Sequence, residues 1–382
     1  MIGSQSDVLG LVMAPPSRGR YNELVARRDR YRTALARMSS TVALAVAALG
    51  LTGCGGANGK PRLRPAAEPA AAPPVVHQPA GRTIRVGVGP EGLAADRRTG
   101  LVVVAVRDPA QLVMFDARTG RLVRRVRTSA APRHLQLAGP GGPVLVPEEP
   151  VNRLLELALP AGRSRSIQVG PHPHDAAADD GRVFVGNEFG RSVSVIQGTR
   201  VVREIGGFVQ PGGVVAVGAE VAVVDVGADS LTLIDARTLR VIGRLGAGAG
   251  PTHAVAGAGG HLYLIDTRGD AILTYATAPT FRQVGRFPLA GTPYGVAIDA
   301  SRGHLWVTLT GRNQLVELAT GGASLRPVAA YPTGRQPNTV AVEPRTGRVF
   351  VANARANSLQ IIEPPLSLGP AQRASRLKKS RK

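Results

Sequence analysis

Short apolar segments separated by turn residues fill the chain between residues 82 and 365. Typical examples are residues 183–187, 231–235 and 349–353, each ending in Asn or Asp. Segments of this length, bounded by Gly, Pro, Asp and Asn, are typical of β-strands, and the region lacks the apolar periodicity of a helix. We therefore predict an all-β domain over residues 82–365.

The apolar segments belong to a unit that occurs seven times. In each unit a proline precedes a short, mostly apolar segment, a turn rich in Asp, Glu and Gly, and three further predicted strands. The fourth strand often carries arginine, as in residues 122–126. Four short strands per unit of about 40 residues indicate the blades of a β-propeller. Seven blades are predicted from the spacings of 38 to 44 residues between Pro90, Pro132, Pro173, Pro211, Pro251, Pro293 and Pro337.

The seventh unit lacks a fourth strand, because the chain turns into Pro364 and Pro365 soon after Ile362. A spare strand is predicted at the other end, over residues 83–86, before the first proline. We expect this N-terminal strand to complete the last blade and close the ring, which removes a sheet edge that invites pairing with other chains.

The N-terminus has the features of an export signal. Arginines at 27–37 precede an apolar run over residues 42–51, and small residues follow. This order is typical of a secretory signal peptide, and the run is shorter than the roughly 20 residues that span a bilayer. The sequence Leu51-Thr52-Gly53-Cys54 resembles the bacterial lipobox, in which the cysteine is acylated. We predict an N-terminal extension and lipoprotein signal peptide over residues 1–53, with lipid attachment at Cys54. The alternative is a cleavage site with an incidental cysteine.

Two further segments flank the predicted propeller. Residues 54–81 contain the lipidated Cys54 and then a stretch rich in Ala and Pro, which favours extended conformations and predicts a semi-stiff tether. Residues 366–382 contain six basic and no acidic side chains, as expected for a disordered basic tail. Beside a lipid anchor, this tail is predicted to form a second, electrostatic contact with an anionic membrane surface.

The formal charge of the chain is +21, and the distribution of the charged residues along the sequence indicates which kinds of partner are expected. More than half of the excess lies outside residues 82–365, which carry 31 arginines against 22 acidic residues. Because an exported protein meets little nucleic acid, the charge favours an anionic envelope surface and we predict no nucleic-acid partner. The single cysteine excludes a disulfide framework and a cysteine-based zinc site.

The repeated units resemble the YVTN-type β-propeller repeat, whose consensus runs through residues 184–187 and 350–353. The Gly-His and Trp-Asp signature of WD-type propellers is absent, since the one tryptophan is Trp306. The resemblance implies the propeller fold, and folds of this kind serve lyases, lactonases and binding proteins alike.

A ligand site is expected where the loop before strand one and the loop after strand two emerge on the same face of each blade. Four of the blades carry His, Asp or Glu at these positions, and this polar arc suits a divalent cation or a cationic or hydroxyl-rich ligand. The alternative is that the Asp and Asn side chains cap their own loops. The candidates are His134, Glu148, Asp175, Asn187, Asp225, His253, Asp266 and Asn353, of which His134, Asp175, His253 and Asp266 are also candidate metal ligands.

Another pair of histidines is less suggestive at this stage. His172 and His174 flank Pro173, and alternate residues around a proline are expected to point in different directions. No Ser/His/Asp or Cys/His arrangement supports nucleophilic catalysis, and the Gly-rich stretches lack the strand–loop–helix context of a phosphate site.

The leading interpretation is an exported, lipid-anchored propeller that acts as a ligand- or protein-binding or scaffold module at the outer face of the cell membrane, rather than an enzyme. It implies no cofactor, a monomeric state, and contacts with the membrane and with an envelope protein or polymer. The alternative interpretation is a metal-assisted hydrolase or lyase, similar to lactonase or streptogramin-lyase propellers, that uses the channel mouth.

Overall fold

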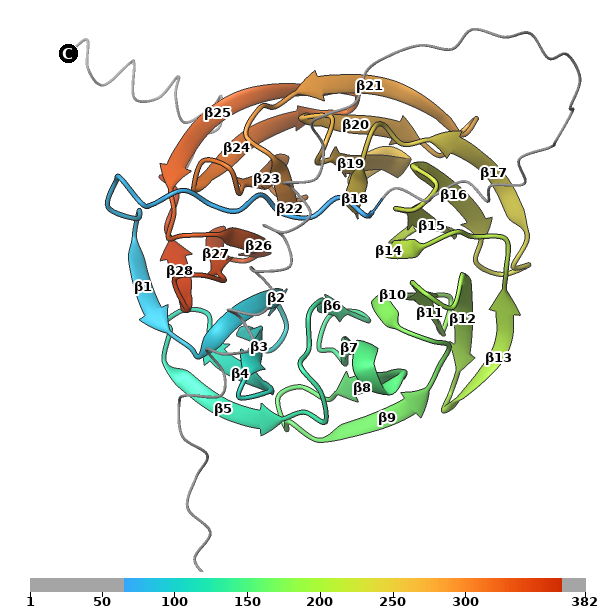
Figure 1. Cartoon of the computed structure of the whole chain (residues 1–382), viewed down its shortest axis with the longest axis horizontal. Coiled ribbons are helices and arrows are strands. Elements are labelled where there is room, and N and C mark those ends of the chain that lie inside the picture. Colours follow the sequence, from blue (N-terminus) through green and yellow to red (C-terminus); the bar gives the residue numbers. More distant parts are fainter. Residues whose placement is uncertain (1–64, 366–382) are drawn as a thin grey trace, which may run out of the picture. The chain divides into compact units, whose positions relative to one another are not determined.

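The computed structural model describes residues 65–365, which form seven four-stranded antiparallel sheets arranged as the blades of a ring (Figure 1). The predicted seven-bladed propeller is thereby confirmed. The predicted signal peptide, Cys54 and the basic tail lie outside the described residues. Within residues 65–365, no helix has the length and apolar character needed to cross a membrane.

The first four blades follow the chain in order. Blade one contains β2 (Val88–Asp96), β3 (Leu101–Asp108), β4 (Gln111–Asp116) and β5 (Leu122–Arg127). Blade two contains β6 (Gln136–Leu137), β7 (Val144–Glu148), the 3-10 turn η1 (Glu149–Val151), β8 (Arg153–Leu157) and β9 (Ser164–Gln168). Blade three contains β10 (Pro173–Asp179), β11 (Arg182–Asn187), β12 (Ser192–Gln197) and β13 (Arg200–Ile205). Blade four contains β14 (Pro211–Val217), β15 (Glu220–Asp225), β16 (Ser230–Asp235) and β17 (Val241–Gly246).

The last three blades complete the ring. Blade five contains β18 (Pro251–Ala256), the 3-10 turn η2 (Ala258–Gly260), β19 (His261–Asp266), β20 (Ala271–Ala276) and β21 (Arg282–Pro288). Blade six contains β22 (Pro293–Asp299), β23 (His304–Leu309), β24 (Gln314–Gly321) and β25 (Ser324–Pro332). Blade seven contains β26 (Pro337–Glu343), β27 (Arg348–Asn353), β28 (Ser358–Ile362) and the N-terminal β1 (Arg82–Arg85).

The ring is closed by the N-terminal strand, as the sequence predicts. Strand β1 pairs antiparallel with β28, so that Arg82 lies opposite Ile361 and Arg85 lies opposite Ser358. Residues more than 270 positions apart therefore belong to one sheet, in which β28 is paired on both sides, by β27 and by β1.

The hydrophobic core of the described residues consists of seven clusters, one between each pair of neighbouring blades. In one of them Phe184 of blade three is buried with Val214 and Val223 of blade four. Because successive side chains of a strand point to opposite faces of the sheet, each central strand contributes to two clusters. Aliphatic residues dominate these clusters, which explains how a chain with 4% aromatic residues builds a core.

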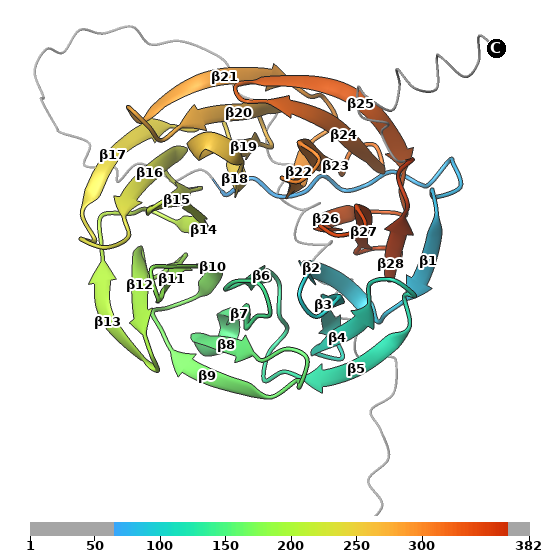
Figure 2. The same cartoon turned by 180° about the vertical axis from the view of Figure 1, so that it is seen from behind.

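The innermost strands surround a central channel, and both views show β2, β6, β10, β14, β18, β22 and β26 around it (Figures 1 and 2). The outermost strands are exposed and carry Arg124, Arg203 and Arg244 on the rim, as edge strands commonly do. We call the face that carries the loops between second and third strands the mouth face.

Turns on the opposite face have the chemistry that the sequence indicates. Asp116 and Asp235, at the ends of third strands, accept hydrogen bonds from the backbone N–H groups of Thr119 and Thr238, at 2.7 and 2.6 Å. Asp96 does the same for Thr99 at 2.8 Å after a first strand. These Asx turns set hairpins of blades one and four on this face.

Candidate functional site

The carboxylates that end the second strands cap loops. Glu148 accepts hydrogen bonds from the backbone N–H of Ser129 at 3.0 Å and from its hydroxyl at 2.9 Å. Asp225 accepts the N–H groups of Val209, Gln210 and Ala228. Asp266 accepts those of Ala249, Gly250 and Gly269, at 3.0, 2.9 and 3.0 Å.

The amides at the same position are committed in a similar way. Asn187 donates to the hydroxyls of Ser192 and Ser194, and Asn353 donates to Ser358 and Gln360. Glu148, Asn187, Asp225, Asp266 and Asn353 are all at most 3% exposed. The three carboxylates bind backbone N–H groups of loops, which supports the capping interpretation for them. Asn187 and Asn353 instead bind side chains of the adjacent strands β12 and β28, and the Oδ1 atom of each is buried without a hydrogen-bond partner. The structure does not bring the five residues into a common ligand site.

The two predicted histidines, by contrast, meet across the channel. The imidazole rings of His134 and His253 lie 5.0 Å apart, between centroids. The ring of His174 packs against that of His134 at 4.5 Å with a tilt of 44°, and Tyr294 packs edge-on against His253 at 4.7 Å. Blades two, three, five and six thus contribute one ring each to a continuous row, which we call the ring row.

Asp175, the remaining predicted site residue, lies on the channel wall beside this row. Its carboxylate accepts hydrogen bonds from Gln136 at 3.0 Å and from the backbone N–H groups of Ala176 and Val214. Burial raises the pKa of Asp175 to about 6, although these hydrogen bonds partly oppose the shift.

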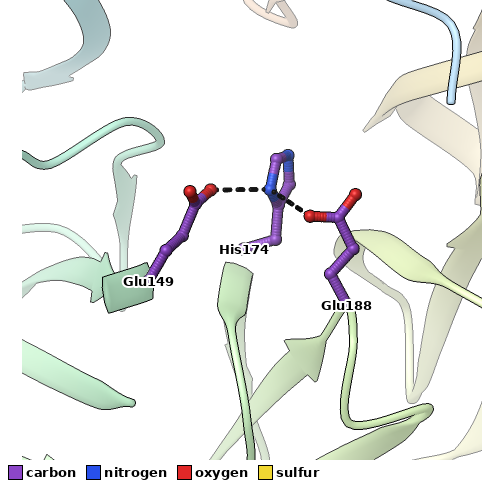
Figure 3. Close-up of side chains that lie close together, drawn as sticks. All are labelled: Glu149, His174 and Glu188. Atoms are coloured by element: carbon purple, nitrogen blue, oxygen red, sulfur yellow. Dashed lines mark ion pairs between the residues drawn. The ribbon is translucent and has the colours of Figure 1, made fainter. Parts of the chain in front are cut away.

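A charged cluster lies next to the ring row, and Figure 3 shows its three central side chains. Nδ1 of His174 lies 2.8 Å from Oε1 of Glu149 and 3.3 Å from Oε2 of Glu188. Glu149 begins η1 directly after β7, Glu188 follows β11, and His174 belongs to β10. Their ligand atoms all lie within 4.8 Å of one another, close enough for one metal ion, and we call these three residues the mouth cluster.

Further charged groups surround the mouth cluster. Nδ1 of His172 lies 3.4 Å from Glu188, and the guanidinium of Arg133 lies 3.5 Å from Glu149. Arg133 also faces Glu91 of blade one at 3.7 Å. Glu91 also pairs with Arg107 at 3.1 Å, and Glu68 lies 4.0 Å from Arg133. With four carboxylates against Arg133, Arg107 and a protonated His174, the site has a small net negative charge, which favours a cationic ligand over an anion.

The mouth cluster and the ring row differ in protonation. Burial alone would lower the pKa of His174, but its contacts with Glu149 and Glu188 outweigh burial and raise it to about 9. Burial would raise the pKa of Glu188, yet the hydrogen bond and charge of His174 lower it to about 2. The cluster is therefore an ion triad at neutral pH, with the proton on His174.

His134 and His253 are neutral at the same pH. Burial, together with the positive charge of His174, lowers the pKa of His253 to about 3 and that of His134 well below its usual value. Nδ1 of His253 lies 3.2 Å from the carbonyl oxygen of Tyr294. Since a carbonyl only accepts, Nδ1 carries the proton and Nε2 of His253 presents a lone pair. Nε2 of His134 is buried without a hydrogen-bond partner.

Two features of this site were missed at the sequence level. The residues that face the mouth are Glu149 and Glu188, each one position beyond the residue we had selected at the end of strand two. The pair around Pro173 also converges, because His172 and His174 lie 3.4 and 3.3 Å from the same oxygen of Glu188. The expectation of different directions fails here because His172 adopts a left-handed conformation, with φ of 58°.

Part of the predicted tether lies on the mouth face. In Figure 1 residues 65–80, which we call the strap, cross the ring along the boundary between the blades of β22 and β26 before the chain enters β1. The side-chain amide of Gln336 donates to the carbonyl of Ala70 at 2.7 Å and accepts the N–H of Ala72 at 2.9 Å. Asn313 donates to the carbonyl of Pro73, and Arg268 donates to that of Pro65.

The strap is extended, as its Ala- and Pro-rich composition indicates, but these contacts hold its first half against the propeller. The side chain of Ala72 is only 3% exposed. Glu68 points back toward the candidate site, with its carboxylate 4.0 Å from Arg133. The hydrogen bonds of the strap therefore go to blades five, six and seven, and its ion pair with blade two is that of Glu68 with Arg133.

Comparison with known proteins identifies similar folds among solved structures. No protein-family model matches the sequence, and no curated protein matches it. Among solved structures, a hydrazine synthase from Kuenenia stuttgartiensis is 17% identical with a TM-score of 0.65, covering 73% of this chain and 96% of that chain. Virginiamycin B lyase from Staphylococcus aureus is 14% identical with a TM-score of 0.59, covering 74% of this chain and 99% of that chain.

Propellers of the WD40 type are similar to the same extent. The WD40 repeats of RRP9 are 11% identical with a TM-score of 0.63, covering 75% of this chain and 99% of that chain. Identities this low show a shared fold alone, and these structures include both enzymes and WD40 repeat proteins. The chain is accordingly a seven-bladed β-propeller, similar to lyase and WD40 propellers in architecture.

Proposed function

We propose that this protein is an exported, lipid-anchored propeller that binds a small ligand at its channel mouth and acts as a binding or scaffold module at the cell envelope. The observation that carries the binding role is the mouth cluster: the segments after β7 and β11, together with strand β10, bring the ligand atoms of Glu149, Glu188 and His174 within 4.8 Å of one another. Loop capping does not account for these three side chains, because none of them binds the backbone of its own loop in the described hydrogen bonds.

The composition of the site supports a cation or a ligand rich in hydrogen-bond donors. Carboxylate and imidazole groups bind divalent cations such as Ca²⁺, Mn²⁺ or Zn²⁺. Which of these ions is preferred depends on how many nitrogen ligands take part. A metal ion must displace the proton from His174, since a protonated imidazole has no lone pair to offer. A polyamine needs no such displacement and pairs with the carboxylates directly.

The binding proposal is tested by titrating the purified protein with Mg²⁺, Ca²⁺, Mn²⁺, Zn²⁺ and spermidine, followed by calorimetry and thermal unfolding. At least one of these cations is expected to bind with micromolar affinity and to raise the melting temperature. The double variant Glu149→Gln/Glu188→Gln should lose this binding while keeping the propeller fold. Absence of binding by every cation, or equal binding by the variant, contradicts the proposal.

The anchoring part of the proposal is supported by the lipobox-like sequence before Cys54 and by the short apolar run that precedes it. Cys54→Ala should move the protein from the membrane fraction to the soluble fraction, because a non-acylated chain has no lipid to insert. A Cys54→Ala protein that stays with membranes after a high-salt wash contradicts lipid anchoring. The salt wash removes binding by the basic tail.

A metal-assisted hydrolase or lyase is the second candidate, and one further observation favours it. His253 presents a neutral imidazole lone pair in the ring row, where it contacts His134, and His134 in turn contacts His174 of the mouth cluster. A neutral imidazole of this kind suits a general base that works near a bound cation. Elemental analysis of the purified protein tests this candidate. A stoichiometric metal that is lost in His174→Ala supports it, whereas protein free of metal that does not take up any added divalent cation opposes it.

A further inference from the structure

The central channel contains a cavity of about 380 Å³ that the mouth cluster does not occupy. Its wall is formed by the first strands of the blades, and the side chains there are aliphatic and often small. They include Ala94, Val215, Ala254, Val296, Ala297 and Val342. The size falls in the range of about 300–1,000 Å³ that is common for small-molecule sites.

The packing between the blades buries the apolar side chains of the cavity wall only in part. Ala254, Val255, Ala256, Val296 and Ala297 are only half-buried, although each also packs against or lies beside an interblade cluster. A continuous apolar surface left open to water is unfavourable by roughly 25 cal/mol per Å², and such surfaces in soluble proteins commonly mark a binding site. The channel wall therefore has a composition suited to an apolar ligand.

One end of the cavity is polar, and its chemistry is specific. His134 and His253 line it at the mouth end, where the ring row crosses the channel. His253 directs its Nδ1 proton to the carbonyl of Tyr294, so its Nε2 is an acceptor without a described partner. The amide of Gln136 is already committed, because its nitrogen lies 3.0 Å from Asp175 and 2.8 Å from the carbonyl oxygen of Val214.

The same end disfavours an anion. No lysine or arginine lines the cavity, and its one ionisable acid is Asp175. The nearest cation, His174, does not line the cavity and is already paired with Glu149 and Glu188. A carboxylate placed there would lose its hydration without a direct cationic partner, which costs several kcal/mol in a buried site. A hydroxyl or amide N–H, in contrast, can donate to Nε2 of His253 at little cost.

We infer that the channel binds a neutral amphiphile, an aliphatic chain or ring system that ends in a hydrogen-bond donor, with the apolar part against the first strands and the donor at His253. This site is distinct from the proposed cation site, because different residues line the two. The ring row forms the boundary between them. A protein held at a membrane surface has access to molecules of this chemistry.

The neutral fluorescent probe N-phenyl-1-naphthylamine, which has an apolar body and one N–H donor, tests the inference on the full chain. Saturable binding with enhanced emission is expected. Decanol should displace the probe, and decanoate at pH 7.5 and equal concentration should displace it at least tenfold less well. Absence of saturable binding overturns the inference, and equal displacement by decanoate overturns the preference for a neutral donor.

Variants locate the probe. Ala297→Leu and Ala256→Leu each add three carbon atoms at the channel wall and should weaken probe binding at least tenfold, while Ala161→Leu, in an exposed turn between β8 and β9, should not. Two channel positions are used so that one poorly folding variant does not decide the result. Glu149→Gln/Glu188→Gln should retain probe binding, so failure of the cation site and failure of the channel site give different results. Unchanged affinity in both leucine variants overturns the inference.

Discussion

Nδ1 of His174 lies 2.8 Å from Oε1 of Glu149. This ion pair joins strand β10 of blade three to the turn η1 of blade two. Glu188 completes the arrangement from the other side, so that His174 stands between two carboxylates (Figure 3). A histidine held in this way keeps its proton at neutral pH, whereas His134, packed against it, does not. The site therefore holds one charged and two neutral imidazoles in contact.

The first prediction concerns the protonation of His174. NMR titration of the imidazole resonances should give a pKa of about 9 for His174, because both carboxylates stabilise the imidazolium more than burial disfavours it. In Glu188→Gln the pKa of His174 should fall, since one charge contact is lost. Backbone amide resonances of the turn η2, on the opposite face, provide an internal comparison that should not respond to the substitution. A His174 pKa near 6.5 in the unsubstituted protein would contradict the proposed ion triad.

The second prediction follows from the direction of the same shift. His174 has a higher pKa in the folded than in the unfolded state, so its contribution to stability is complete below pH 6.5 and is lost as the pH rises through about 9. The free energy of unfolding should therefore fall between pH 7 and 9, by up to about 1.4 kcal/mol per pH unit from this group. Urea unfolding at a series of pH values measures the slope.

His174→Gln is the control for that slope, because glutamine keeps a polar side chain of similar reach without a titratable proton. The variant should be less stable at pH 7 and should show a smaller decrease of stability between pH 7 and 9. An identical slope in both proteins would assign the pH dependence to other groups.

The third prediction separates loop capping from ligand binding at Asp266. All three of its backbone hydrogen bonds reach the same oxygen, Oδ1. Asp266→Asn keeps an oxygen that can accept them, whereas Asp266→Ala leaves three N–H groups without this partner. We expect Asp266→Ala to destabilise the protein by about 1–3 kcal/mol and Asp266→Asn by clearly less. Thermal and urea unfolding measure both, and neither variant should change cation affinity at the mouth cluster.

The propeller itself was predictable because its signals are local and repeated. Each blade contains a proline and then apolar segments separated by turn residues, in the same order, so one weak pattern is reinforced seven times. Closure by β1 was also predictable, since the missing fourth strand after Ile362 and the spare strand before Pro90 are complementary. Such arguments need only chain order and strand count, and both are visible in the sequence.

The site was less predictable because it depends on which of two adjacent residues faces the channel. Glu148 and Glu149 are adjacent residues of the same type. Glu148 is nevertheless buried and caps a loop, whereas Glu149 begins η1 at the mouth. The left-handed backbone of His172 likewise decides that His172 and His174 converge. Local composition carries no signal for either choice, since both depend on contacts between neighbouring blades.

The docking of the strap was also not predictable from the sequence of the strap itself. Its Ala- and Pro-rich sequence correctly indicates an extended segment without a core of its own. Whether such a segment is free or bound depends on side chains far along the chain, here Gln336 and Asn313, which recognise its backbone. Backbone recognition leaves little trace in the sequence of the segment that is recognised.

The last prediction tests this docking. Gln336 holds Ala70 and Ala72 through both ends of its amide, so Gln336→Ala should loosen the strap at blade seven, where Arg335 alone then donates to the carbonyl of Ala72. Hydrogen exchange at the amide of Ala72 should become at least tenfold faster, because its acceptor is removed. Arg355→Ala, in an exposed loop of the same blade, is the matched control and should leave this exchange unchanged. If the amide of Ala72 already exchanges in the unsubstituted protein at the rate of an unstructured peptide, the strap is not docked in solution, and Glu68 is then not held near Arg133.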